Sequence, residues 1–483
     1  MKESMRKAVI IGAGPAGLTA GYELTQAHGW AVSVIEKDEQ VGGLSKTFVF
    51  KGCRFDIGPH HFITEHEHIL RWWQHLMGDD FAALQRFTRI YYKRRFFHYP
   101  LSPLNAITNL TLIECVQCVA SYVKAKILPK RSIVSLQDFM INRFGKRLFQ
   151  MFFKNYTEKL WGMSCDAISA DWAAQRIRNF SLCKAIFFAF FGRWFKKYAP
   201  RTIQDTFYYP SRGAGTLWQR VAGIIEQSSE NVIELGQNVI GIEHDGSCIT
   251  AVLTSSSKVP AGSSCIVRRH EGDYFFSTMT LSSLVQALDP VAPAHVRAAA
   301  CALRCRSLIV VNLIVNKPFI SPDHWLYIHE TRVQHIRVGN MNNFSSKMVD
   351  DQTHTALSFE YFMSTEDDLW HWSDQELIAL CSREIELLGL AHQTEVLDGM
   401  VVRAADAYPI YDAQYQEHVQ CVRSYLAQFN NLRLIGRNGT HSYNNMDAAM
   451  LSAMDAVACV QEYAMSTHAS KRECTSSSSG ARL

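Results

Sequence analysis

Residues Lys7–Thr47, KAVIIGAGPAGLTAGYELTQAHGWAVSVIEKDEQVGGLSKT, decide the fold of this 483-residue chain. They begin with an apolar run, Ala8–Ile11, of the kind that a buried parallel strand needs, and continue into a segment with helical character, Ala16–Ala27. Three glycines follow the apolar run at G-x-G-x-x-G spacing: Gly12, Gly14 and Gly17. In a nucleotide-binding unit such glycines permit a tight turn, the close approach of backbone to a pyrophosphate, and the packing of helix on strand.

The predicted helix begins at these glycines, so its N–H groups and its dipole would face the phosphates. A second apolar run, Ala31–Ile35, ends in Glu36, nineteen residues after Gly17. An acidic side chain at that distance accepts hydrogen bonds from the ribose hydroxyls of a bound dinucleotide. Strand, glycine turn, helix and acid together predict a dinucleotide-binding unit.

The extension Val41–Thr47 indicates which dinucleotide is bound. Gly42 and Gly43 come shortly after Glu36, and the hydroxyl residue Ser45 follows them. This arrangement resembles the second half of the long FAD fingerprint of the superfamily that contains amine oxidases, protoporphyrinogen oxidases and UDP-galactopyranose mutases. The alternative is an ordinary glycine turn in an NAD enzyme, and the short distance between Glu36 and the glycine pair favours FAD.

The composition is that of a folded protein, because 47% of the residues are hydrophobic and 19% are charged. The chain is long enough for two or three domains. A formal net charge of +4 is small for this length and gives no indication of nucleic-acid binding. We therefore expect a multidomain protein that acts on a small molecule.

The 13 cysteines follow no repeating spacing. Cys115 and Cys118 form a C-x-x-C in a helical-looking stretch, Leu112–Lys126, without the second pair that a zinc site would need. We expect reduced thiols and no metal. Residues 1–7 are short and polar, unlike a signal peptide, and no apolar run approaches the length of a membrane span, so we expect a cytoplasmic protein.

After the predicted strand Arg54–Ile57, a Gly58-Pro59 turn precedes two histidines, His60 and His61. Adjacent side chains point in different directions, so only one of them is expected to face a site, and a lone histidine is more often structural. The stretch is similar to the G-P-H-x-F loop that lies over the flavin in UDP-galactopyranose mutases. This resemblance implies an active-site role for His60, although the family's further histidine is Ile63 here.

The helical middle of the chain contains two more segments of interest. Leu136–Trp161 has apolar residues at helical spacing, interrupted near Gly145, and predicts a pair of helices. Its end, YTEKLWG, resembles the Y-T-x-K-Q-W-G stretch that walls the substrate cavity of the mutases. The resemblance implies that Tyr156 and Trp161 contact substrate, and the alternative is that both are core aromatics.

Three arginines are candidates for binding a diphosphate. Arg176 and Arg178 alternate, so on a strand both would lie on one face and could form bidentate, charge-assisted contacts with phosphate. The mutases have an arginine pair here with different spacing, so which of the two faces substrate stays open. Arg337 lies among predicted strands, Leu308–Asn316 and Thr355–Phe362 included, that resemble the sheet over the mutase cavity and imply a second phosphate-binding arginine.

Two segments mix basic and aromatic residues. Arg89–Pro100 predicts either a short hairpin whose cations extend to solvent or an entrance for an anionic substrate. Ala185–Tyr198 predicts a buried helix, with a membrane-surface contact as the less favoured alternative.

The chain then returns to the nucleotide-binding domain. Tyr208–Gln219 resembles a Y-P-x-x-G-x-G segment in which Gly213 and Gly215 allow backbone near the cofactor. Val239 lies where family members hold the adenine through the main chain. These resemblances place the middle of the chain beside the first glycine motif.

The end of the chain, Leu432–Val457, has a strand, a glycine and a helix starting near Asp447. It resembles the G-R-x-G-x-x-x-Y-x-x-M-D ending of the mutases, in which Arg437 and the Met-Asp pair would contact FAD and Tyr443 would reach the phosphates. His441 differs from the family residue and is expected beside Tyr443 at the substrate. The implied FAD contacts are Gly12, Gly14, Gly17, Glu36, Lys37, Gly43, Leu44, Ser45, Val239, Gly436, Arg437, Asn445, Met446 and Asp447.

The family resemblance implies an α/β fold with a discontinuous Rossmann-like FAD-binding domain and an inserted substrate domain of helices and antiparallel sheet. The FAD-binding domain is expected to comprise residues 1–75, 205–290 and 395–465. A mainly helical substrate region, 76–204, and an antiparallel-sheet region, 291–394, would interrupt it, and residues 466–483 would form a disordered tail.

Three functions are compatible with this sequence. In the first, as in the mutases, reduced flavin N5 acts on the sugar of a nucleotide-sugar-like diphosphate substrate in a redox-neutral rearrangement, with a reduced nicotinamide or other donor supplying the electrons. In the second, FAD takes a hydride from an amine, a C–C bond or a sugar alcohol, as in amine oxidases and protoporphyrinogen oxidases. The third is a flavin-stabilised interaction module without catalysis. The candidate arginines and Tyr443 favour an anionic substrate and therefore the first function.

Overall fold

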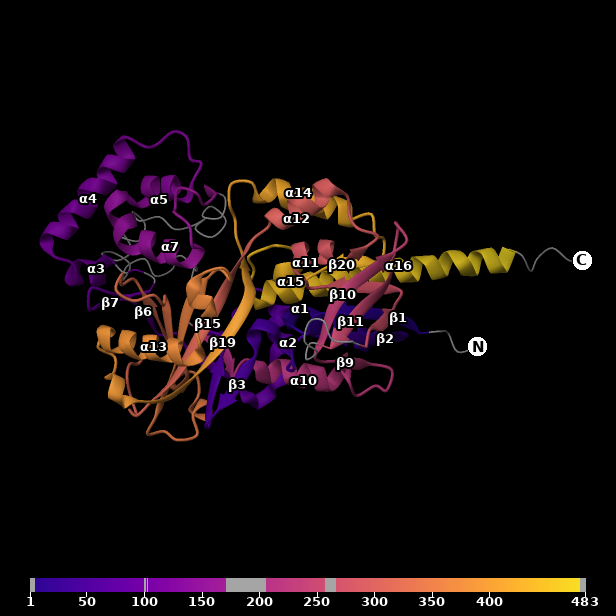
Figure 1. The fold of residues 1–483 in the computed structure, drawn as a ribbon, viewed down its shortest axis with the longest axis horizontal. Coiled ribbons are helices and arrows are strands. Elements are labelled where there is room, and N and C mark those ends of the chain that lie inside the picture. The colour runs from indigo at the N-terminus through magenta and orange to yellow at the C-terminus, as the bar shows by residue number, and fades with distance from the viewer. Residues whose placement is uncertain (1–4, 100, 102, 171–205, 257–265, 478–483) are drawn as a thin grey trace, which may run out of the picture. The chain divides into compact units, whose positions relative to one another are not determined.

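The computed structural model describes residues 5–99, 101, 103–170, 206–256 and 266–477, and the chain divides into two compact units (Figure 1). Unit 1 consists of Met1–Ser45, Leu217–Ala302 and Val419–Leu483. Unit 2 consists of Lys46–Thr216 and Leu303–His418. The predicted α/β fold, in which one unit is assembled from separate parts of the chain, is confirmed.

Unit 1 is built on a parallel sheet in the order β20-β13-β1-β2-β9. Its strands are β1 (Arg6–Ile11), β2 (Trp30–Ile35), β9 (Val232–Glu234), β13 (Tyr274–Ser277) and β20 (Leu432–Leu434). β1 is central and its last four residues are buried, as a parallel strand covered by helices requires. The helix α1 (Pro15–Gln26), which connects β1 to β2, packs against α16 (Met446–Ser477). The predicted strands and helix of the first motif are confirmed.

A second sheet of unit 1 has the order β12-β11-β10-β14. Its strands are β10 (Gln237–His244), β11 (Ile249–Ser256), β12 (Arg268–Glu271) and β14 (Leu288–Asp289). β11 and β12 pair antiparallel, and residues 257–265 between them lie outside the described residues. The other helices of this unit are α10 (Gly215–Ile225), which starts in unit 2, α11 (Leu281–Gln286), α12 (Ala294–Ala302), α14 (Tyr415–Leu426), which also starts in unit 2, and the short α15 (Gly436–Gly439).

Unit 2 contains an extended sheet in the order β19-β15-β18-β17-β16-β6-β7. Its strands are β6 (Thr88–Tyr92), β7 (Arg95–His98), β15 (Cys305–Val315), β16 (Trp325–Ile328), β17 (Arg337–Asn340), β18 (Thr355–Met363) and β19 (Val396–Pro409). The pairing is antiparallel except between β6 and β16. The helix α13 (Asp374–Leu388) packs on this sheet and begins with a capping box of Ser373 and Glu376.

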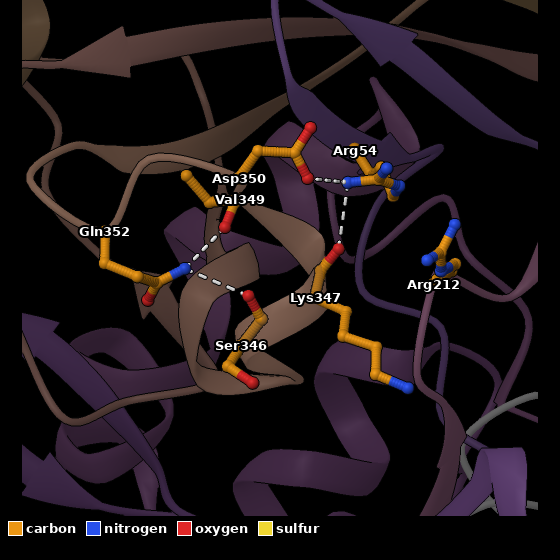
Figure 2. A pocket seen from close by; sticks show the side chains of 7 residues that line it. All are labelled: Arg54, Arg212, Ser346, Lys347, Val349, Asp350 and Gln352. Atoms are coloured by element: carbon orange, nitrogen blue, oxygen red, sulfur yellow. Dashed lines mark hydrogen bonds and ion pairs between the residues drawn. The ribbon is translucent and has the colours of Figure 1, made fainter.

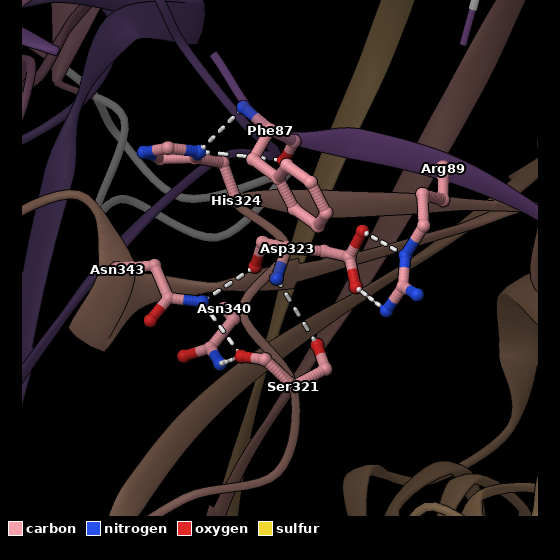
Figure 3. Close-up of polar contacts among 7 residues, drawn as sticks. All are labelled: Phe87, Arg89, Ser321, Asp323, His324, Asn340 and Asn343. Carbon is pink, nitrogen blue, oxygen red and sulfur yellow. Dashed lines mark hydrogen bonds and ion pairs between the residues drawn. The ribbon is translucent and has the colours of Figure 1, made fainter. Parts of the chain in front are cut away.

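β6 and β7 form the predicted hairpin of the basic and aromatic segment, but one of its cations, Arg89, pairs with a buried acid and does not extend to solvent. Its turn residues, Lys93 and Arg94, have φ of 50° and 60°. Arg89 forms two hydrogen bonds, of 2.9 and 2.7 Å, with the carboxylate of buried Asp323 (Figure 3). Asn343 donates to the carbonyl of Asp323 at 2.6 Å, so the loop that precedes β16 is fixed beside β6.

The helical part of unit 2 follows the hairpin. It consists of α3 (Pro103–Asn109), α4 (Leu112–Ile127), α5 (Leu136–Phe144), α6 (Lys146–Phe149), a π-helical turn (Gln150–Lys154) and α7 (Asn155–Trp161). The predicted break occurs at Gly145, where φ is 81° and a Cβ would lie 2.7 Å from the amide nitrogen of Tyr122. Cys115 and Cys118 lie on α4 as free thiols, as expected.

Smaller elements complete unit 2. They are α2 (Glu67–Met77) and the strand pairs β3 (Thr47–Phe50) with β4 (Cys53–Asp56), and β5 (Phe81–Gln85) with β8 (Thr206–Pro210). Among the residues that the structure describes, no helix has both the length and the apolarity to cross a membrane.

The unit boundaries differ from the expected domain boundaries. β19 was expected in the FAD-binding domain, but it pairs along all of β15 and joins unit 2. Residues 46–75 also join unit 2, where Thr47 and Asp56 bond to groups between residues 209 and 215. α16 continues to Ser477, whereas residues 466–483 were expected to form a disordered tail.

Asp56 is a buried carboxylate that joins three segments of unit 2. It accepts hydrogen bonds from the hydroxyls of Thr47 and Tyr209, both at 2.6 Å, and from the amide of Ala214 at 3.2 Å. Burial raises the pKa of Asp56 to about 6, although these three donors each lower it. Between about pH 4, where an ordinary aspartate titrates, and about pH 6, the folded state holds a proton that the unfolded state releases, so this group makes stability fall as pH rises.

We predict that Tyr209→Phe lowers the free energy of unfolding by about 1–3 kcal/mol, because a buried carboxylate loses a donor. The loss is larger at about pH 8 than at about pH 5, because the ionised carboxylate gains more from the hydrogen bond than the protonated form does. Denaturant unfolding of the FAD-loaded protein at both pH values measures this. Tyr208→Phe, on the same strand with its ring stacked on Phe81, is the control, and equal losses for both variants would contradict the prediction.

Candidate functional site

The carboxyl ends of the parallel strands in unit 1 lie at one edge of the sheet. In the sheet, β2 lies on one side of β1, whereas β13 and β20 lie on its other side. In an open α/β sheet, the ligand crevice is expected where the strand order reverses in this way, at the carboxyl ends of the strands. The amide of Gly12 donates to Ile35 at 2.7 Å, and both the amide and the hydroxyl of Thr278 donate to Ile11, at 3.0 and 2.8 Å. The loops after β1, β2 and β13 are therefore bonded to one another.

Several glycines at this edge stand where the packing leaves no room for a side chain. Gly12 has φ of +99°, and a Cβ there would lie 2.0 Å from the hydroxyl oxygen of Thr278. A Cβ on Gly17 would lie 1.9 Å from the carbonyl oxygen of Gly12, so helix and turn touch through backbone. A Cβ on Gly43 would lie 2.9 Å from the Cα of Gly14. The two glycine motifs therefore approach each other through backbone atoms, with no side chain between them.

The N-terminus of α1 has the properties that a pyrophosphate requires. Gly14 caps the helix without any side-chain hydrogen bond, and Pro15 stands at its first position. The first turn contains no acidic residue. The amides of this turn are therefore open to an anion, and the helix dipole favours one. This backbone cradle fits the pyrophosphate of FAD.

Glu36 lies at the end of β2 with only 6% of its surface exposed. Its carboxylate accepts the amides of Ala13 at 2.7 Å and Asp38 at 3.0 Å, one at each oxygen. Each oxygen keeps acceptor capacity, which suits the ribose hydroxyls that the sequence predicted for it. Lys37, the next residue, is exposed.

The C-terminal motif meets the N-terminal motif within unit 1. A Cβ on Gly436, where φ is +75°, would lie 2.9 Å from the Cβ of Ala16 in the first turn of α1. The hydroxyl of Ser45 lies 3.8 Å from the sulfur of Met446 at the start of α16. Residues from both ends of the chain thus lie together next to the N-terminus of α1.

Arg437 organises the loop between α15 and α16. Its guanidinium donates twice to the carbonyl of Asn444, at 3.1 and 2.7 Å, and lies 5.5 Å from the ring centre of Tyr443. His441 is buried in the same loop with φ of 46°. Arg437 therefore contacts the backbone of Asn444 and the ring of Tyr443, a predicted substrate residue.

The remaining predicted cofactor residues lie on neighbouring elements of unit 1. Val239 is half-buried on β10, whose first residue, Gln237, donates its amide to the carbonyl of Glu36 at 2.9 Å. Leu44 is half-buried in the second glycine motif. Asn445 is exposed just before α16, and Asp447 is in its first turn. Their contacts with FAD stay predictions.

In unit 2, Arg337 forms an ion pair with Glu360, which lies directly opposite on β18, with 2.5 Å between the nearest nitrogen and oxygen. The Arg337 side chain is 19% exposed and that of Glu360 is 1% exposed. Burial alone would lower the pKa of Arg337, but the charge of Glu360 keeps it raised. A Cβ on Gly58 would lie 2.9 Å from the carboxyl carbon of Glu360. The predicted Arg337 and the predicted histidine loop are therefore brought together by one carboxylate.

Tyrosines surround this ion pair. The electrostatic neighbours that raise the pKa of Arg337 include Tyr156, Tyr327 and Tyr408. Tyr156 stacks on His329, with ring centres 5.0 Å apart, and meets Tyr327 edge-on at 5.8 Å. Burial raises the pKa of Tyr327, so its hydroxyl keeps its proton. Burial also lowers the pKa of His329 to about 3, and its imidazole is neutral at ordinary pH.

The two adjacent histidines have different surroundings. The ring of His61 stacks on Trp325, with centres 5.2 Å apart and planes at 14°. Burial lowers the pKa of His61 to about 4, so it is uncharged. His60 is half-buried on the same loop. The packing of His61 leaves His60 as the predicted active-site residue.

The other predicted substrate residues are less informative. Trp161 is buried at the end of α7. Arg176 and Arg178 lie outside the described residues, as does the aromatic segment Ala185–Tyr198. Gly213 and Gly215, predicted near the cofactor, approach Thr47 closely in unit 2.

Sequence reasoning missed Glu360, Tyr327, Tyr408 and His329. The register that pairs Arg337 with Glu360 cannot be read from the sequence, because it depends on long-range strand pairing. One signal was present: Glu360 is the charged residue of an otherwise uncharged strand that is buried along its whole length. A buried carboxylate needs a partner, and a search for one would have led to an arginine.

A separate cavity of about 370 Å³ in unit 2 is lined by three cations and one carboxylate (Figure 2). Arg54 is held there by Asp350 at 2.7 Å and by the carbonyl of Lys347 at 2.9 Å. Arg212 and the ammonium of Lys347 supply the other positive charges. The sequence did not predict this cavity, and none of its lining residues belongs to the Arg337 cluster.

Curated relatives match parts of the chain. A 1-hydroxycarotenoid 3,4-desaturase of Flavobacterium sp. (strain P99-3) is 45% identical over 62 residues, which are 13% of this chain and 12% of that protein. A probable UDP-galactopyranose mutase of Klebsiella pneumoniae is 26% identical over 176 residues, 34% of this chain and 43% of that protein. The matches thus span less than half the length of these relatives.

Solved structures match nearly the whole fold. Reduced UDP-galactopyranose mutase superposes with a TM-score of 0.78 at 20% identity, covering 95% of this chain and 96% of that one. Cyclohexylamine oxidase from Brevibacterium oxydans IH-35A superposes with a TM-score of 0.65 at 14% identity, covering 95% of this chain and all of the other. Residues 15–461 match the family model described as flavin containing amine oxidoreductase. The chain therefore belongs to the flavin-containing amine oxidoreductase family, and its cofactor is FAD.

Proposed function

We propose that this flavoenzyme acts on a nucleotide-sugar-like substrate and that Arg337 binds its diphosphate. The observation that carries this proposal is an unused hydrogen-bond donor on the Arg337 guanidinium. Glu360 accepts a hydrogen bond from one terminal nitrogen of Arg337, whereas Nε of Arg337 is buried without a hydrogen-bond partner among the described residues. A buried donor of this kind is costly unless a ligand accepts from it.

The unused donors of Arg337 suit an anion, although the Arg337–Glu360 ion pair has no net charge and Oε1 of Glu360 is also buried without a partner among the described residues. Arginine has five donors in a planar fork that matches the geometry of phosphate. Glu360 offsets the charge of Arg337 but uses only part of that fork. A bound diphosphate would therefore find unused donors on a guanidinium that burial has already removed from water.

The tyrosines suit the rest of such a substrate. Tyr327, which keeps its proton, can donate a hydrogen bond to a sugar hydroxyl. Tyr156 presents a ring that already stacks on His329, and a nucleobase can stack on an aromatic surface in the same way. His60 and Tyr443 are proposed as further contacts on the basis of the family resemblance.

FAD, when bound in its reduced form, would supply a nucleophilic N5 for chemistry at the sugar. The residues of this chain would bind the substrate, neutralise its phosphates and hold its sugar in place. The full-length similarity to a UDP-galactopyranose mutase fold supports this proposal, as does the partial sequence match to a probable mutase.

The second candidate is an oxidase that takes a hydride from an amine. The description of the family favours it, and a cyclohexylamine oxidase shares the fold. An amine substrate is a cation at neutral pH, however, and an ammonium group cannot accept a hydrogen bond from the unpartnered Nε of Arg337. This unused donor therefore places the amine oxidase candidate second.

One prediction of the proposed function concerns the binding of FAD. Glu36→Gln removes a buried carboxylate that we expect to bind the ribose, so FAD affinity should fall about tenfold or more. The release of flavin fluorescence on dilution of the purified holoprotein measures this. Glu226→Gln, at an exposed acid just after α10, is the control, and it should leave FAD affinity unchanged. Full retention of FAD by Glu36→Gln would contradict the assigned role of this carboxylate.

The second prediction concerns the substrate. Arg337→Lys keeps the positive charge but loses the fork, so binding of UDP-sugars to the reduced protein should weaken about tenfold. Arg337→Ala should weaken binding about a hundredfold, because charge and donors are both lost. The perturbation of the reduced flavin spectrum during titration with a panel of nucleotide sugars measures both. Bound FAD should stay at its normal content.

Arg332→Lys is the control for these variants, because Arg332 is 45% exposed and pairs with Glu330 instead. The role of Arg337 would be wrong if Arg337→Lys lost FAD or bound UDP-sugars normally. Failure of the unaltered protein to bind any nucleotide sugar would reject the nucleotide-sugar proposal. Steady oxygen consumption with an amine would then establish the second candidate.

A further inference from the structure

The outward face of α4 carries a continuous row of exposed aliphatic side chains. At 3.6 residues per turn, side chains at these spacings fall on one face of a helix. Their exposed fractions range from 46% to 80%, and we call them the α4 stripe: Leu112, Ile113, Val116, Val119, Val123 and Ile127. Three more exposed aliphatic residues follow the helix: Leu128, Ile133 and Val134.

The opposite face of α4 attaches the helix to the rest of unit 2. Ala125 is buried, and the sulfur of Cys118 lies 3.8 Å from that of Met151. The hydroxyl of Ser121 accepts the amide of Arg147 at 3.0 Å. Figure 1 shows α4 at the outer side of the helical group that it forms with α5 and α7. The helix is therefore anchored by one face, and the stripe is the other.

The charges around the stripe are almost all positive. Residues 93–134 contain seven lysines and arginines and a single acid, Glu114. Glu114 is paired with Lys93 at 3.0 Å and also caps the helix at Thr111, so its charge is offset. Lys93 and Arg94 are therefore near the first turn of α4, while Lys124 and Lys126 are in its last turns. An apolar row with cations at both ends is the pattern of a helix that lies at a lipid surface.

The chemistry of the stripe favours lipid over protein as its partner. Protein interfaces are enriched in tyrosine, tryptophan and arginine at their centres, whereas this row is aliphatic throughout. Contiguous apolar surface of this kind marks an interaction site in a soluble domain. Basic side chains at its ends are complementary to anionic headgroups. At 16 residues, α4 is too short to span a bilayer and would lie in the plane of its surface.

We propose that the α4 stripe docks this protein on an anionic phospholipid surface. The aliphatic side chains enter the boundary between headgroups and acyl chains, while the flanking lysines and arginines contact lipid phosphates. This docking is independent of the proposed reaction, because it uses none of the residues assigned to FAD or substrate.

Flotation of the FAD-loaded full chain with vesicles tests the proposal. The protein should float with vesicles of phosphatidylcholine and phosphatidylglycerol in equal parts, and much less with phosphatidylcholine alone. Val119→Asp/Val123→Asp should reduce binding about tenfold or more, because charges would enter the apolar layer. Lys124→Gln/Arg131→Gln should reduce it about tenfold and weaken its dependence on salt.

Val49→Asp/Val291→Asp is the matched control, since both valines are exposed, at 67% and 69%, and lie elsewhere on the chain. It should bind vesicles like the unaltered protein. The proposal is overturned if the unaltered protein ignores anionic vesicles or if the stripe variant floats normally. It is also overturned if sedimentation shows a dimer that the stripe variant dissociates, which would make a second copy the partner. A fall in thermal stability confined to the stripe variant would equally overturn it, because part of this chain would then cover the stripe.

Discussion

The candidate substrate site in unit 2 depends on the buried ion pair of Arg337 and Glu360. Removing one partner of such a pair typically costs about 3–5 kcal/mol, because the other charge stays buried and unpaired. The sheet of unit 2 provides the geometry, since β17 and β18 place the two residues directly opposite each other. The same carboxylate packs under Gly58, so the histidine loop is positioned by the ion pair as well. In the proposed function, this carboxylate holds Arg337 in place for the diphosphate of the substrate.

Unit 1 achieves its binding geometry by a different means, the close approach of backbone. Gly12, Gly17 and Gly436 each stand where a Cβ would meet another atom at less than 3 Å. These contacts bring the first and last motifs of the chain together at the α1 N-terminus. Side chains are thereby excluded from the phosphate cradle, and Glu36 is left at its rim as the buried acid.

Local patterns predicted the parts of the molecule that depend on local chemistry. The glycine turn, α1 and the break at Gly145 all follow from propensity and spacing. The long-range pairing of strands was harder to predict from the sequence. The pairing of Arg337 with Glu360 depends on strand register, and the assignment of β19 to unit 2 depends on its pairing with β15. Family resemblance supplied Arg337 as a candidate, but only the structure shows which side chains surround it.

The measurement that tests the central claim most directly is a comparison of UDP and uridine binding by the unaltered protein and by Arg337→Lys. The two ligands differ by the diphosphate alone, so the ratio of their affinities isolates its contribution. We predict that the unaltered, FAD-loaded protein binds UDP more tightly than uridine. The ratio of the two affinities should be about tenfold smaller in Arg337→Lys. An equal preference in both proteins would show that Arg337 does not bind the diphosphate.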